Sequence, residues 1–153
     1  MIFVDTSAWW ALKAPDDRFH DDAVSFYDLL KAGRHGSLVV SDYVLDETAT
    51  LLMDTKGGAV ATRFLDEALA SKSVRLIWVD PDLFHEATKT FKNGSNRGWS
   101  FTDCTSFQLM HRLKIIDAFA FDQHFGEAGF NRLPGIQIQR ENHVLLVRSG
   151  TTP

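Results

Sequence analysis

The sequence predicts an α/β fold, a three-layer α/β/α sandwich whose central sheet is mostly parallel. Short apolar runs typical of buried strands alternate along the chain with longer segments in which apolar residues recur every three or four positions. The chain has no internal repeat, linker or low-complexity segment that would divide it. We therefore expect one domain over residues 1–148, followed by a flexible tail over residues 149–153.

The composition is that of an ordinary soluble domain, and 153 residues are enough to bury a core without staples. The single cysteine, Cys104, excludes an internal disulfide and a cysteine zinc cluster. Residues 1–4 lack the basic leader of a signal peptide, and no apolar run approaches the roughly 20 residues that cross a bilayer. We expect a cytoplasmic protein without membrane contact. Its formal charge of −4 disfavours nonspecific coating of nucleic acid, but not an enzyme that meets phosphate through metal ions.

The first predicted strand is the apolar run that ends at Asp5. In open α/β sheets the carboxyl ends of the strands form the edge where ligands bind, so Asp5 is the first candidate for chemistry. The first helix should begin at Thr6 or Ser7 and end before Pro15.

A second helix is predicted over residues 20–32, closed by Gly33, and a second strand over residues 37–40. The apolar positions of this helix fall three or four apart, at Ala23, Val24, Tyr27 and Leu30.

Ser41 and Asp42 offer an N-cap for a third helix, which should run to about Lys56, before Gly57 and Gly58. Its predicted buried stripe consists of Val44, Leu45, Thr48, Leu51 and Leu52.

A fourth helix is expected over residues 59–70 and a third strand over residues 74–79. Pro81 suits the first turn of a helix that reaches about Phe91. Residues 92–99 have the most loop-like interior composition.

The next helix should start at Ser100 and continue to about Leu113, before a strand over residues 115–121 that Asp122 closes. Short edge strands at residues 135–139 and 143–147 would complete the fold.

Four acidic residues have placements that converge on one edge of this sheet. Asp5 and Asp122 end strands, and Asp103 lies at the mouth of a helix that Ser100 and Thr102 can cap without it. Any one of these acids has a structural explanation, as a helix cap, a first-turn residue or a turn residue.

Glu47 is harder to explain as a structural residue. On a helical wheel with about 100° per residue and Val44 at 0°, Glu47 lies at about 300°, on the border of the buried stripe. Asp46 lies at about 200° and faces solvent. Placing a carboxylate at that border costs free energy unless a positively charged group or ion pairs with it.

Four carboxylates gathered together repel one another and take up protons unless cations are bound. Hard oxygen ligands without histidine or cysteine favour one or two Mg²⁺ or Mn²⁺ ions over zinc. Waters on such ions can attack phosphorus, so the predicted chemistry is metal-assisted phosphodiester hydrolysis.

Four segments resemble the PIN domain in order and setting, and most closely the ribonuclease toxins of VapC type. They are residues 3–7, Glu47 within its helix, residues 100–107 and residues 120–125. The resemblance runs from residue 2 to about residue 138, and its third and fourth segments are the most specific.

The resemblance implies a PIN-like fold and an endoribonuclease in which Asp5, Glu47, Asp103 and Asp122 bind the metal ions. Metal-activated water would cleave RNA to leave 5′-phosphate and 3′-hydroxyl ends, without a side-chain general base. Thr6, or alternatively Ser7, would orient Asp5 from behind, and Thr102 would also support the ligands.

The same resemblance implies partners. Similar toxins form homodimers and are held inactive by a small antitoxin protein, so DNA would be contacted only indirectly, through the antitoxin.

Several residues have both a functional and a structural interpretation. Lys89, Lys92 and Arg97 could guide RNA phosphates or form a solvated helix end. The adjacent Trp9 and Trp10 must point in different directions, one into the core and the other toward a base or an antitoxin side chain.

Three further residues are ambiguous in the same way. Trp99 shares the ambiguity of the other two tryptophans, and His124 could approach the substrate, although structural hydrogen bonding explains it as well. Asp117 begins its strand, at the wrong end of the sheet for a ligand.

Other functions remain open on the sequence alone. A housekeeping RNA-processing or DNA-directed nuclease would use the same metal site. A phosphoacceptor signalling domain would be expected to carry paired acids after the first strand and a lysine after the last, where this chain has Thr6-Ser7 and Gln123-His124. A binding module whose acids no longer act is disfavoured by the intact set of four.

Overall fold

The computed structural model describes residues 1–135 and confirms the predicted α/β fold. Five parallel strands form one sheet in the order β3-β2-β1-β4-β5. The strands are β1 (Ile2–Val4), β2 (Leu38–Ser41), β3 (Val74–Ile77), β4 (Asp117–Phe119) and β5 (Asn131–Leu133).

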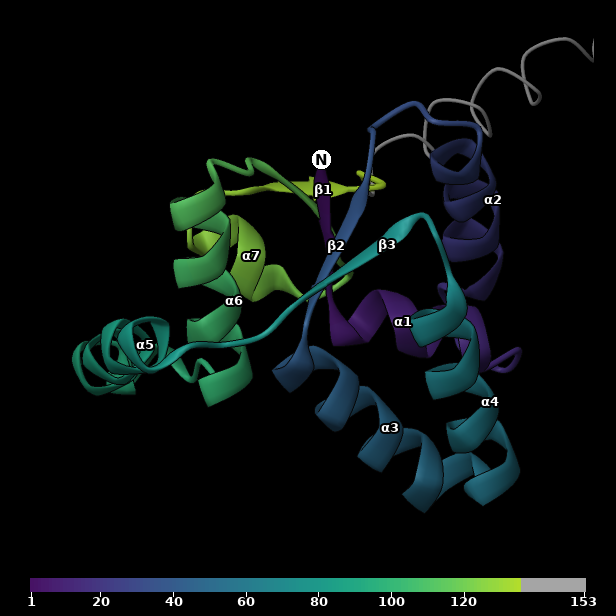
Figure 1. Cartoon of the computed structure of the whole chain (residues 1–153), viewed down its shortest axis with the longest axis horizontal. Coiled ribbons are helices and arrows are strands. Elements are labelled where there is room, and N and C mark those ends of the chain that lie inside the picture. The colour runs from purple at the N-terminus through teal and green to yellow at the C-terminus, as the bar shows by residue number, and fades with distance from the viewer. Residues whose placement is uncertain (136–153) are drawn as a thin grey trace, which may run out of the picture.

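Helices α5, α6 and α7 lie on one side of the sheet, and α1, α2 and α4 lie on the other (Figure 1). The helices are α1 (Thr6–Lys13), α2 (His20–Lys31), α3 (Asp42–Lys56), α4 (Gly58–Ala70), α5 (Pro81–Asn93), α6 (Phe101–Leu113) and α7 (Gln123–Glu127), with a 3₁₀ turn, η1 (Ser95–Arg97). None of these helices combines the length and the apolar character that crossing a membrane requires.

The central strand β1 is fully buried because it pairs with β2 on one side and with β4 on the other. Phe3 is aligned with Val39 and with Ala118, and the amide of Asp5 donates a hydrogen bond of 3.0 Å to the carbonyl of Phe119. The strands are parallel, so their carboxyl ends meet at one edge, where α1, α3 and α7 begin. This edge brings together residues from both ends of the described chain.

The N-cap predicted for α3 is confirmed, because the Ser41 hydroxyl accepts a hydrogen bond of 3.2 Å from the amide of Val44. The predicted buried stripes were wrong at two positions. Val24 on α2 and Leu51 on α3 are each 38% exposed, and Phe26 is buried in place of Val24. Each of the two exposed residues lines a cavity at the border of its helix's buried face.

The last part of the chain differs from the prediction. The strand expected over residues 115–121 is only three residues long, because the chain leaves the sheet after Phe119 and starts the unpredicted helix α7. The final parallel strand is β5, which the sequence analysis did not find. Gly135 is not in a strand, and the rest of the edge strands expected at residues 135–139 and 143–147, together with the tail, lies outside the described residues.

Candidate functional site

Asp5 follows β1 and is 4% exposed, at the N-terminus of α1. Its Oδ2 accepts hydrogen bonds from the Ser7 hydroxyl at 2.5 Å and from the Ser7 amide at 3.0 Å. Of the two residues expected to orient Asp5, the structure therefore assigns this contact to Ser7. The Ser7 hydroxyl also accepts a hydrogen bond of 2.9 Å from the amide of Phe121, which links Asp5 to the segment that carries Asp122.

Burial raises the pKa of Asp5 from 3.8 to about 7. The hydrogen bonds from Ser7 oppose this rise, and the negative charges of Asp103 and Asp122 add to it. The ionised carboxylate is therefore costly in the protein alone and would be favoured by a cation.

Glu47 lies half-buried on α3, whereas its neighbour Asp46 is exposed, as the helical wheel predicted. The Oε2 atom of Glu47 accepts a hydrogen bond of 2.6 Å from the hydroxyl of Thr6. Thr6 thus orients Glu47 and not Asp5, which corrects the expected contact. The two consecutive hydroxyl residues at the start of α1 each hold a different acid.

Asp103 is 7% exposed in the first turn of α6. Its Oδ2 accepts a hydrogen bond of 2.7 Å from the Ser100 amide, and the Ser100 hydroxyl accepts one of 2.9 Å from the Asp103 amide. Ser100 caps the helix as expected, and Asp103 also takes part, because these two bonds form a capping box. Burial raises its pKa and the charge of Asp122 adds to this, while the hydrogen bonds from Ser100 oppose the rise. Thr102 is half-buried and does not line the cavity described below.

Asp122 caps α7, and its Oδ1 accepts a hydrogen bond of 2.9 Å from the amide of His124. The imidazole Nδ1 of His124 lies 3.3 Å from Oδ2 of Asp103 and 3.4 Å from Oδ1 of Asp122. These three residues offer ligand atoms that all lie within 4.8 Å of one another. The sequence analysis gave His124 no ligand role, although its position in the first turn after Asp122 was the available signal.

All four predicted acids line one cavity of about 370 Å³ at the carboxyl edge of the sheet. Its wall is made by the acids, their supporting residues and a few neutral groups: Asp5, Thr6, Ser7, Trp10, Glu47, Leu51, Gly98, Ser100, Asp103, Asp122 and His124. The expected convergence of the acids is therefore present in the structure. Asp117 is not part of it, because it begins β4 at the opposite end of the strand.

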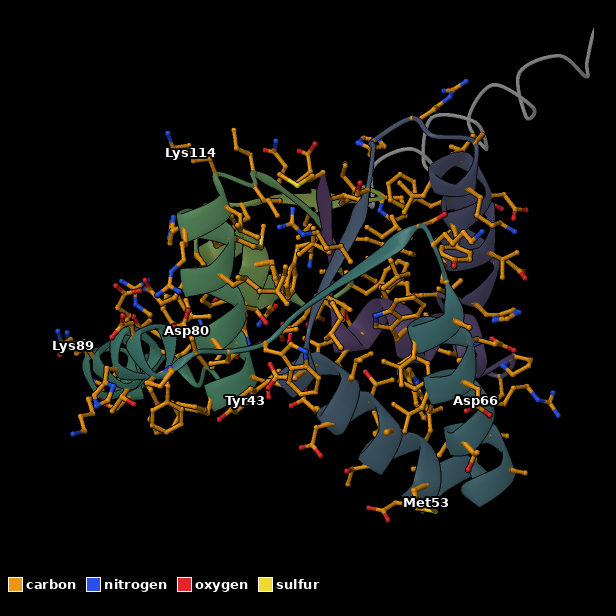
Figure 2. All side chains as sticks on the ribbon, in the orientation of Figure 1. Tyr43, Met53, Asp66, Asp80, Lys89 and Lys114 are labelled. Carbon is orange, nitrogen blue, oxygen red and sulfur yellow. The ribbon has the colours of Figure 1, made fainter. Side chains whose placement is uncertain are left out.

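The two predicted cationic contacts are exposed and do not line this cavity. Lys92 is at the end of α5, and the Arg97 guanidinium lies 4.8 Å from the centroid of the Trp99 ring. Arg97 directly precedes Gly98, which does line the cavity, so its position is at the rim. Lys89 lies at the outer side of α5, away from the sheet (Figure 2).

The pair of tryptophans divides as expected. Trp9 is 4% exposed and packs in the core, with its ring centroid 5.5 Å from that of Phe64. Trp10 lines the cavity, and its indole Nε1 donates a hydrogen bond of 3.0 Å to Asp17. Cys104 is buried, and burial raises the pKa of its thiol to about 11, so it is a packed and unreactive residue.

The donor set suits a hard divalent cation. Carboxylate oxygens are the ligands that Mg²⁺ and Mn²⁺ prefer, and an imidazole is compatible with Mn²⁺. The two buried acids at the centre, Asp5 and Asp103, both have raised pKa values, so a bound cation would relieve both burial and mutual repulsion. The residues present therefore fit a divalent metal site.

Comparisons with known proteins agree with this geometry. A family model described as PIN domain matches residues 2–131. The 23S rRNA-specific endonuclease VapC20 of Mycobacterium tuberculosis is 38% identical over 130 residues, which cover 85% of this chain and 95% of that protein. A VapC ribonuclease of Archaeoglobus fulgidus is 29% identical over 123 residues, which cover 80% of this chain and 77% of that protein.

A solved structure extends the likeness to three dimensions. The crystal structure of M. tuberculosis VapC20, described as a Sarcin-Ricin loop cleaving toxin, matches with a TM-score of 0.80 at 35% sequence identity. The match covers 87% of this chain and 98% of that one.

Proposed function

The chain belongs to the PIN domain family, and from this premise we propose that it is a Mg²⁺- or Mn²⁺-dependent endoribonuclease that acts as the toxin of a toxin–antitoxin pair. The observation that carries the proposal is the single cavity lined by Asp5, Glu47, Asp103 and Asp122. Since VapC20 and the A. fulgidus relative are both named as nucleases, the reaction class follows the family.

The four acids would hold one or two ions at the carboxyl edge of the sheet. A bound ion supplies a water molecule of lowered pKa that can attack phosphorus, so no side-chain general base is needed. Ser7 orients Asp5 through two hydrogen bonds, and Thr6 orients Glu47 through one. The expected products are a 5′-phosphate and a 3′-hydroxyl.

His124 would be an additional ligand beside Asp103 and Asp122. Its Nδ1 lies 3.3 Å from a carboxylate oxygen of Asp103 and 3.4 Å from one of Asp122, so the three side chains could hold one ion together. An imidazole ligand favours Mn²⁺ over Mg²⁺, because Mg²⁺ prefers oxygen donors.

The substrate is proposed to be RNA, with ribosomal RNA as the first candidate because of the likeness to a 23S rRNA-specific endonuclease. Lys92 at the end of α5 and Arg97 at the rim would attract phosphates to an otherwise acidic cavity. We expect the enzyme to act in the cytoplasm. The alternative of a phosphoacceptor domain loses its support, because the chain belongs to a nuclease family.

The partners proposed from the resemblance are a cognate antitoxin and a second copy of the chain. An apolar surface suited to self-association lies on α5, where Phe84 and Phe91 are 42% and 43% exposed. Both rings contact Phe101, with centroids 5.1 Å and 5.8 Å apart, and Phe101 in turn contacts Tyr43 at 5.8 Å. Tyr43 lies at the start of α3, close to the start of α6 (Figure 2).

The test is incubation of the purified protein with a defined RNA and Mn²⁺, with and without a chelator. We expect cleavage that requires the metal and disappears in Asp5→Asn and in Asp103→Asn. The matched control is Asp46→Asn, an exposed acid on α3, which should cleave normally. Activity that resists the chelator, or full activity in either site variant, would contradict the proposal.

A further inference from the structure

Two apolar side chains line the cavity that holds the four acids. Trp10 comes from α1 and Leu51 from α3, and Leu51 is 38% exposed although it is a leucine. Neither can bind a metal ion, and whereas Trp9 is buried in the core, Trp10 is only partly buried against it and also lines the cavity. An apolar wall in a carboxylate cavity requires an explanation of its own.

The wall is continuous with the residues that position the acids. Trp10 follows Ser7 by three residues and Thr6 by four, so all three lie on the same face of α1. Leu51 follows Glu47 by four residues on α3, which places it one turn further along the same face. Whatever contacts the wall therefore lies directly beside the proposed metal ligands.

The Trp10 ring is fixed before any ligand binds. Its Nε1 donates to Oδ2 of Asp17 at 3.0 Å, and Oδ1 of Asp17 accepts a hydrogen bond of 2.8 Å from the amide of Phe19. The ring is therefore tied to the loop after α1. A ring held in one orientation loses little conformational entropy on binding, which makes stacking on it more favourable.

A positive charge lies over this ring, in contrast to the acidic groups that line the cavity. The ammonium group of Lys56, at the end of α3, is 5.3 Å from the centroid of Trp10 and forms an ion pair with the exposed Asp16. An exposed ion pair of this kind contributes little free energy, so Lys56 can exchange Asp16 for a phosphate at small cost. A planar apolar surface followed by a cation matches a nucleobase followed by its phosphate.

We propose that Trp10 and Leu51 bind the base of a nucleotide adjacent to the cleaved phosphate, and that Lys56 binds the next phosphate. This inference rests on the proposed RNA cleavage and adds a requirement for an unpaired base, because a base can reach the wall only when it is not stacked in a helix. The cavity of about 370 Å³ lies at the small end of the roughly 300 to 1,000 Å³ range of ligand sites, so it has room for one nucleotide.

The experiment combines an abasic scan of the RNA with variants of the wall. An oligonucleotide that contains the mapped cut is made with a single abasic nucleotide at each position around it, and kcat and KM are measured for the wild type and for Trp10→Ala. We expect one abasic position to raise KM for the wild type by about 10-fold, the size of base–aromatic stacking. Trp10→Ala should raise KM to the same extent on intact RNA, and the same abasic position should then add less than about 2-fold.

Two variants separate stacking from a fold defect. Trp10→Phe keeps a planar ring and should recover most of the affinity, while Trp78→Ala removes a tryptophan that is 71% exposed and does not line the cavity, and should change nothing. The melting temperature Tm of each variant is measured beside its kinetics. Lys56→Gln should raise KM by a few fold and weaken the dependence of KM on salt.

The outcomes are distinguishable from those of the proposed function. No cleavage of intact RNA by the wild type would count against the ribonuclease itself. Normal cleavage with additive effects of the abasic site and Trp10→Ala would overturn the base-binding role alone. The base-binding role would also be overturned if Trp10→Ala cleaves RNA like the wild type but is inhibited less by the antitoxin. Trp10 and Leu51 would then bind a protein side chain.

Discussion

The hydroxyl of Ser7 lies 2.5 Å from Oδ2 of Asp5 and at the same time accepts a hydrogen bond from the amide of Phe121. The hydroxyl donates its one hydrogen bond to the Asp5 carboxylate, and its oxygen accepts the hydrogen bond that positions the segment before Asp122. One small side chain thus holds two of the four proposed ligands in register.

Ser7→Ala should therefore reduce both metal affinity and cleavage, by about 10- to 100-fold, as for other groups that orient metal ligands. The affinity for Mn²⁺ can be measured by calorimetry and the rate with a fluorescent RNA. Ser37→Ala, at an exposed residue before β2, is the control and should behave as the wild type. Unchanged Mn²⁺ affinity in Ser7→Ala would show that Asp5 needs no such support.

Glu47→Gln and Asp46→Asn form a matched pair on one helix. Glu47 lines the cavity and accepts a hydrogen bond from Thr6, whereas Asp46 is exposed. We expect Glu47→Gln to lower kcat by at least about 100-fold. In other enzymes, removing one group that stabilises a charge developing in the transition state lowers kcat by this factor. Asp46→Asn should stay within about 2-fold of the wild type. Equal effects of the two changes would contradict the assignment of Glu47.

The stability of the metal-free protein should depend on pH through Asp5. Its pKa of about 7 in the folded state lies above the ordinary aspartate value of 3.8, so the folded state binds more protons than the unfolded state between these values. Tm in the presence of a chelator should therefore fall as the pH rises from about 4 to about 7. The buried Asp103, whose pKa is also raised, adds to the same trend.

Two controls accompany the pH series. Asp5→Asn removes the titrating group and should flatten the decrease in Tm, and saturating Mn²⁺ should raise Tm most at the alkaline end, where the carboxylates are ionised. If Tm of the metal-free protein instead rises across this range, Asp5 is ionised at low pH and the cost assigned to its burial is wrong.

His124→Ala should weaken Mn²⁺ binding more than Mg²⁺ binding, because an imidazole ligand is worth more to Mn²⁺. His124→Asp restores an oxygen donor at the same position and should recover Mg²⁺ binding. The measurement is direct titration of each ion, independent of cleavage. Equal losses for both ions in His124→Ala would mean that His124 only hydrogen-bonds to Asp103 and Asp122.

Self-association should depend on the aromatic surface of α5. Phe91→Lys, or Phe84→Lys, places a charge on a ring that is more than two-fifths exposed, and should lower the molar mass measured by light scattering to that of a monomer. Ile116→Lys changes a more exposed apolar residue before β4, 64% exposed, and should leave the mass unchanged. A dimer that survives both phenylalanine changes must use another surface.

The sequence alone was sufficient for the parts of the fold that depend on local pattern. Asp5 could be placed because an apolar run stops at it, and Glu47 because the helical wheel separates it from Asp46. The sheet predicted from alternating strands and helices has the predicted parallel direction in all four pairings.

Features that depend on side-chain rotamers or distant contacts were not predictable in this way. His124 comes within reach of Asp103 only because α6 and α7 pack together. The strand β5 has the polar sequence Asn-Arg-Leu, and it forms because the edge of β4 offers backbone partners rather than because of any apolar pattern.

The ligands of the proposed metal site are far apart along the chain, since Asp5 follows β1 and Asp122 follows β4. The Ser7 hydroxyl connects these two segments directly, through the amide of Phe121. A nascent chain that still lacks β4 and α7 therefore has an incomplete carboxylate cluster. The proposed nuclease site would be assembled only after both elements have been synthesised, so a chain truncated before β4 should not cleave RNA.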